Sequence, residues 1–79
     1  MSPRDALRVV RARRQLASGE ARAIRVQSGL LLHEMAEALE VSVPTVSKWE
    51  RGERTPKADH ALAYAGLIDE LSRIVEGAA

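Results

Sequence analysis

The side chains that could do chemistry in this chain are a few serines, two histidines and many arginines, and their spacing favours binding over catalysis. The chain has no cysteine, which excludes a disulfide framework and a cysteine-based metal site. His33 and His60 are isolated and too few for a metal site. Ser47 lacks a His/Asp arrangement that would activate it as a nucleophile. We therefore expect no enzyme, no metal ion, no cofactor and no small-molecule ligand.

Positive charge is concentrated in the front of the chain, although the net charge of the whole is only +1. Residues 1–57 hold eleven Lys and Arg against seven Asp and Glu, whereas residues 58–79 hold one Arg against four acidic residues. This asymmetry indicates that residues 1–57 bind a polyanion. The longest apolar runs, such as residues 29–32, are too short for a membrane span or a signal segment. These features and the absence of cysteine predict a soluble cytoplasmic protein.

Local signals predict five helices and no strand. Ser2 and Pro3 start the first helix, which should run to about residue 17. Ser18 is expected to cap the second helix and Gly29 to end it. We expect an all-α fold, a compact bundle with an extra N-terminal helix and a long C-terminal helix.

The third and fourth helices are short and joined by a tight turn. The third is expected over residues 31–40, and the fourth over residues 43–51, with Ser42 as its cap and Gly52 at its end. A pair of this kind is a helix-turn-helix, the geometry that places a helix in the major groove of DNA.

The last helix carries a heptad-like apolar seam. Thr55 and Pro56 should begin it, and Gly66 is a weak point where it could bend or break. The seam residues recur at spacings of 3, 4, 3 and 4: Ala61, Tyr64, Ile68, Leu71 and Val75. The seam could close the core of one chain, or its far end could pair two chains through Ile68, Leu71, Ile74 and Val75. A homodimer would hold two DNA-facing helices about 34 Å apart. A monomer is the other alternative.

Residues 20–71 resemble the Cro/repressor-type, or XRE-like, helix-turn-helix family of phage and bacterial regulators. Residues 35–39 and the following Val41-Ser42 match the scaffold helix and the turn, and residues 45–56 match the recognition helix and the loop after it. The resemblance covers about two-thirds of the chain and implies that residues 1–79 form one DNA-binding domain. Its parts would be an extra basic helix at 1–18, the family core at 20–71 and a C-terminal tail at 72–79.

The resemblance also implies a structural ion pair and shows three departures from the family. The residue at Glu50 usually pairs with an arginine of the first family helix, and Arg25 stands at that position. Leu31 and Leu32 stand where the family usually has a capping Ser or Thr and a phosphate-contacting Gln, and Glu40 stands where it usually has Gly. We therefore expect a lost cap, a left-handed residue at some energetic cost, and weaker phosphate anchoring.

The base-reading candidates implied by the resemblance lie on the recognition helix. They are Val43, Pro44, Thr45, Ser47 and Lys48. Lys48 could donate to guanine, and Val43 and Pro44 could pack on thymine methyl groups. Only one of these five residues, Lys48, is charged, so direct recognition of bases should be limited. DNA shape or a second binding element would then be a further source of specificity.

Basic residues after the recognition helix and on the first helix are the candidates for DNA backbone contacts. The first set is Arg51, Arg54, Thr55 and Lys57. The second set, Arg4, Arg8 and Arg11, lies on one face of the first helix at spacings of 4 and 3. This face could be a second DNA-binding arm or simply a solvated surface, and both interpretations stay open.

These observations predict a sequence-specific transcriptional regulator that binds double-stranded DNA. The resemblance favours a Cro-like phage or prophage repressor that acts by operator occupancy in a bacterial or phage-infected cytoplasm. An antitoxin or adaptor-type protein-interaction module, which would use the same fold and dock through its C-terminal helix, is the alternative.

Overall fold

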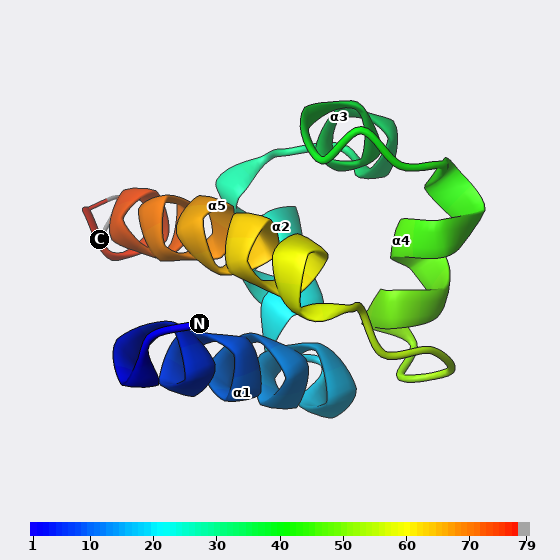
Figure 1. The fold of residues 1–79 in the computed structure, drawn as a ribbon. Helices are drawn as coiled ribbons and strands as arrows, with labels where there is room; N and C mark the ends of the chain where they lie inside the picture. The colour runs from blue at the N-terminus through cyan, green and yellow to red at the C-terminus, as the bar shows by residue number, and fades with distance from the viewer. Residues whose placement is uncertain (78–79) are drawn as a thin grey trace.

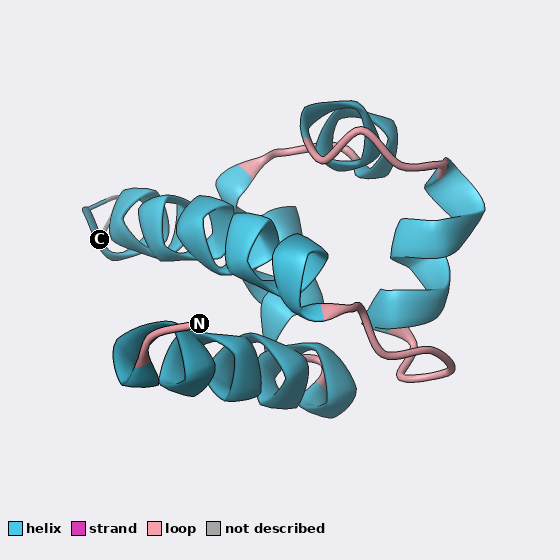
Figure 2. Ribbon diagram, viewed as in Figure 1, coloured by secondary structure: helices cyan, strands magenta, loops and turns pink. Residues whose placement is uncertain are grey.

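Five helices follow one another in the computed structural model, which describes residues 1–77. They are α1 (Pro3–Ser18), α2 (Glu20–Ser28), α3 (Leu32–Ala38), α4 (Val43–Glu50) and α5 (Ala58–Gly77) (Figure 1). Loops join them, and no strand occurs in the described range (Figure 2). The predicted all-α fold with a long last helix is confirmed.

Two helices begin at the predicted serine caps. Ser2 Oγ accepts a hydrogen bond from Asp5 N at 3.0 Å, and Pro3 is the first helical residue of α1. Ser42 Oγ accepts one from Thr45 N at 3.3 Å at the start of α4. Each serine thereby satisfies a backbone N–H that has no partner within the first helical turn.

Two other helix starts differ from the predictions. Ser18 is the last residue of α1, and Gly19, with a left-handed φ of 87°, is the N-cap residue of α2. Ser18 Oγ still accepts a hydrogen bond from Glu20 N at 3.3 Å, so the serine caps the first N–H of α2 from outside the N-cap position. The last helix begins at Ala58 rather than at Thr55-Pro56. Arg13 Nε donates to the carbonyl oxygen of Pro56 at 3.1 Å, so that carbonyl is tied to α1 and not to the helical ladder.

Four helices end in a motif in which a left-handed residue follows the helix, and Gly19 fills this place after α1. Gly29 follows α2 with φ 88°, and Gly52 follows α4 with φ 73°. Glu40 takes the equivalent place after α3 with φ 56°, the one non-glycine residue with positive φ in the described range. Val41 N then donates to Ala36 O at 3.0 Å. This early turn ends α3 at Ala38, two residues before the predicted end.

The core lies around α5, which packs against α1 and α2, while α3 packs against α4. Figure 1 shows α1 on the side of α5 that faces away from α3. α5 is one helix from Ala58 to Gly77, so the weak point at Gly66 does not break it. The central buried side chains are Leu16, Ala21, Met35, Ala36, Leu39, Val46, Trp49, Tyr64, Ile68 and Leu71.

The apolar seam of α5 belongs to this core. Ile68 and Leu71 are only 1% and 7% exposed, so the prediction that they pair two chains is wrong for these two side chains. Ile74, at 58% exposed, and half-buried Val75 are the accessible members at the far end. The predicted tail continues α5 as far as residue 77, and residues 78–79 lie outside the described residues. No helix within residues 1–77 combines the length and apolarity needed to span a membrane.

Candidate nucleic-acid interface

The turn between α3 and α4 fixes the angle at which α4 projects from the molecule. Ala36, Leu39 and Val46 are buried in the wedge between the two helices. Because these three side chains pack inward, the opposite face of α4 lies at the surface, and Figure 1 shows this helix at the end of the molecule away from both termini. Val43, 39% exposed, and Lys48 lie on this outer face.

Two of the five candidate readers are engaged by neighbouring side chains. Thr45 Oγ1 lies 2.7 Å from Ser42 Oγ, so its hydroxyl takes part in the cap of α4. Ser47 Oγ accepts a hydrogen bond from Arg51 Nη1. The other three, Val43, Pro44 and Lys48, are exposed and make no side-chain hydrogen bond within residues 1–77.

Arg51 is held from two sides. Besides its bond to Ser47, its Nε donates to Glu53 Oε2, and both side chains of this ion pair are 55% exposed. Glu53 was not among the predicted partners of Arg51. Its position directly after the left-handed Gly52 is what folds it back beside the end of α4.

The loop after α4 borders a surface hollow of about 360 Å³. The residues around it come from α4, the loop and the first turn of α5: Thr45, Trp49, Arg54, Thr55, Pro56, Lys57 and His60. Arg54 and Lys57 are exposed and form no ion pair among the described side chains. The hollow therefore joins three of the predicted backbone contacts into one basic surface, and His60 was not among those predictions.

A buried ion pair fixes α4 to the rest of the protein. Arg25 Nε donates to Glu50 Oε2 at 2.6 Å and Arg25 Nη2 donates to Glu50 Oε1 at 3.0 Å, with side-chain exposures of 9% and 3%. Arg25 Nη1 also donates to Leu30 O at 3.0 Å, and Tyr64 OH reaches Glu50 Oε2 at 3.4 Å. The pair therefore connects α2, α4, α5 and the loop before α3, the structural role that the family resemblance implied.

The environment of this pair shifts two pKa values. The hydrogen bonds to Glu50 raise the pKa of Arg25 above its ordinary value, against a smaller opposing effect of burial. Burial raises the pKa of Tyr64 strongly, and the nearby Glu50 carboxylate adds to this rise. Arg25 thus stays charged and Tyr64 stays neutral at neutral pH.

The start of α3 lacks a side-chain cap, as the departure from the family pattern predicted. Leu31 is the N-cap residue and has no polar side chain, but Glu34 Oε1 accepts a hydrogen bond from Leu31 N at 2.9 Å. One half of a capping box is therefore present. Leu31 is 56% exposed, Leu32 is half-buried against the core, and His33 is exposed.

Arg8 and Arg11, two of the three α1 arginines predicted to contact DNA, lie beside α5. Arg8 Nη2 is 3.7 Å from Asp69 Oδ2 on α5. Arg11 lines a hollow together with Asp69, Arg73 and Glu76, also of α5. This placement associates the basic face of α1 with the acidic helix of the same chain.

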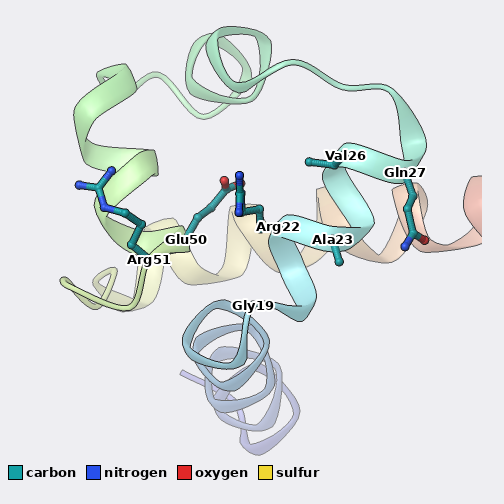
Figure 3. A pocket seen from close by; sticks show the side chains of 7 residues that line it. All are labelled: Gly19, Arg22, Ala23, Val26, Gln27, Glu50 and Arg51. Atoms are coloured by element: carbon teal, nitrogen blue, oxygen red, sulfur yellow. The ribbon is translucent and has the colours of Figure 1, made fainter.

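Another surface hollow, of about 570 Å³, lies between α2 and the end of α4. Figure 3 shows Arg22 and Glu50 near its centre, with Arg51 and Gln27 at opposite edges. The Glu50 carboxylate is already bound by Arg25, and Arg51 points away from the hollow. The hollow therefore does not gather converging polar groups of the kind that bind a small ligand.

Comparison with known proteins identifies the family. A family model described as helix-turn-helix matches residues 22–74, about two-thirds of the chain. Curated proteins and solved structures gave no match. The matched range contains all of α3 and α4 and excludes α1. Because the match spans well over half of the chain, the protein belongs to the XRE-type helix-turn-helix family of DNA-binding regulators.

Proposed function

We propose that this protein is a sequence-specific transcriptional regulator, a Cro-like repressor of phage or prophage type that acts by occupying an operator. The observation that carries the proposal is the exposed face of α4, on which Val43, Pro44 and Lys48 lie free of side-chain partners. The Arg25–Glu50 pair holds this helix rigidly, so its outer face can enter the major groove with little further ordering.

The proposed base contacts are few. Lys48 donates to guanine O6 and N7, and Val43 and Pro44 pack on thymine methyl groups. The hydroxyls of Thr45 and Ser47 are already hydrogen-bonded to Ser42 and Arg51. They therefore contribute more to the shape of this surface than to the recognition of bases. Discrimination consequently depends in part on DNA shape and deformability.

The proposed backbone contacts lie beside α4. Arg51, Arg54, Thr55 and Lys57 follow α4 directly and form its basic border. Contacts of this kind set affinity and make binding salt-dependent, but they carry no sequence information. Two copies on one palindromic site would meet, if they touch through α5, at Ile74 and Val75, the accessible residues of the predicted dimer face.

Selection of bound duplexes from a random DNA pool at about 100 mM salt tests this proposal. The expected result is an enriched short site, palindromic when two copies bind together. Lys48→Ala should relax the preference at one position in each half-site, by about 1–3 kcal/mol of discrimination. A pool that shows no enrichment, with a protein partner retained through α5, would instead support the antitoxin or adaptor function.

A further inference from the structure

His60 covers the outer side of the single tryptophan of the chain. The His60 and Trp49 ring centroids are 5.5 Å apart and the ring planes are tilted by 44°. The His60 side chain is 38% exposed, and its Nδ1 lies 3.9 Å from Asp59 Oδ1. The imidazole is thus fixed against a buried indole while its remaining edge faces solvent.

The exposed edge of His60 faces a hollow that already carries two positive charges. Arg54 and Lys57 line the same hollow and form no ion pair within residues 1–77. Thr45 of α4 also lines the hollow. The hollow therefore adjoins the helix that we propose to enter the major groove.

We propose that the hollow receives one phosphate group of the DNA backbone and that His60, in its imidazolium form, donates a hydrogen bond to that phosphate. This inference rests on the proposed DNA-binding function. An imidazolium has two N–H donors and no acceptor, and charge-assisted bonds to phosphate are stronger than neutral ones. Histidine is the side chain whose charge ordinarily changes between about pH 5 and 8, so the DNA affinity of this protein rises as the pH falls through that range.

His60 has charged neighbours of both signs. Asp59, next to it on α5, is negative, whereas Arg54 and Lys57 of the loop are positive. The groups that α4 places against it, Trp49 and Thr45, carry no charge. A bound phosphate adds negative charge to the side where the two basic residues lie, so DNA binding and protonation of His60 favour each other.

The test measures binding of a fluorescently labelled random-sequence duplex of about 20 base pairs at pH 8 and pH 6, at constant ionic strength. A phosphate contact is independent of sequence, so no operator is required. The native protein is expected to bind roughly three- to tenfold more tightly at pH 6, the effect of one added charge-assisted contact. His60→Gln should match the native protein at pH 8 and lose this increase. His33→Gln, which changes the only other histidine of the chain, should keep it.

A second readout uses Trp49, whose fluorescence an adjacent imidazolium quenches. The pH midpoint of this quenching should move to a higher pH when the duplex is added. A native protein that binds DNA equally at both pH values, or a response lost in His33→Gln and kept in His60→Gln, would overturn the role of His60 and leave the DNA-binding function standing. Absence of binding at both pH values would overturn both.

Discussion

Glu50 is the residue on which the position of α4 depends. It is 6% exposed and binds Arg25 through both carboxylate oxygens. The cost of burying this charge is offset only while Arg25 is present, because removing one partner of a buried pair leaves the other uncompensated. The pair therefore contributes more to the placement of the DNA-facing helix than to stability as such.

Arg25→Ala should lower the free energy of unfolding by about 3–5 kcal/mol. Arg51→Ala is a matched control, because its ion pair with Glu53 is exposed and pairs of that kind contribute less than about 1 kcal/mol. Urea denaturation followed by Trp49 fluorescence measures both. Equal losses in the two variants would show that the buried pair has no special role.

Glu40 is a second residue whose conformation has a measurable cost. With φ at 56° it occupies a left-handed position that costs a residue with a Cβ about 1 kcal/mol relative to glycine. Glu40→Gly should therefore raise the free energy of unfolding by about 1 kcal/mol. Glu40→Gln removes the charge but keeps the strain, so it should leave stability unchanged and strengthen DNA binding. A Gly variant no more stable than the Gln variant would contradict the strain argument.

At the scale of the elements, local signals determined most helix boundaries. The caps at Ser2 and Ser42 and the ends at Gly29 and Gly52 depend on atoms within a few residues, so they could be predicted from the sequence. The start of α5 could not, because the contact that decides it joins residues 13 and 56, which are far apart along the chain.

The start of α3 offers a test of capping. Leu31 contributes no side-chain acceptor there, although Glu34 already supplies the other half of a capping box. Leu31→Ser should complete the box and raise the free energy of unfolding by about 0.5–1 kcal/mol, because a serine at this position accepts a hydrogen bond from the first turn. Leu31→Ala controls for loss of the exposed leucine. Identical stability of the Ser and Ala variants would show that no cap forms.

At the scale of the whole molecule, α1 is the part that the family match does not cover. It packs on α5 and α2, and Arg8 faces Asp69 of the same chain. We expect the triple change of Arg4, Arg8 and Arg11 to Gln to leave the salt dependence of DNA binding unchanged. An arm that contacts three phosphates would instead lose about three units of the salt slope, since each contact contributes about 0.9.

The global arrangement also explains which parts of the site could be predicted. Residue types and family spacing were sufficient for the Arg25–Glu50 pair, because both positions lie within the family pattern. The role of the apolar seam of α5 was ambiguous, because a heptad spacing is expected both when α1 and α2 cover the seam and when a second chain covers it. Ile68 and Leu71 are buried within the chain, which supports the first alternative for these two residues. The Arg51–Glu53 pair and His60 depend on how the loop folds back onto α4, which no periodicity encodes.

The central claim is that α4 recognises the base sequence of DNA while the loop after α4 binds the DNA phosphate backbone. The direct measurement compares Lys48→Ala with Arg54→Ala on a selected duplex and on single-base variants of it, across a range of salt concentrations. Lys48→Ala should reduce discrimination at one base pair, whereas Arg54→Ala should weaken binding to every duplex equally and flatten the salt slope by about one unit. The account is contradicted if both variants bind all duplexes as the native protein does.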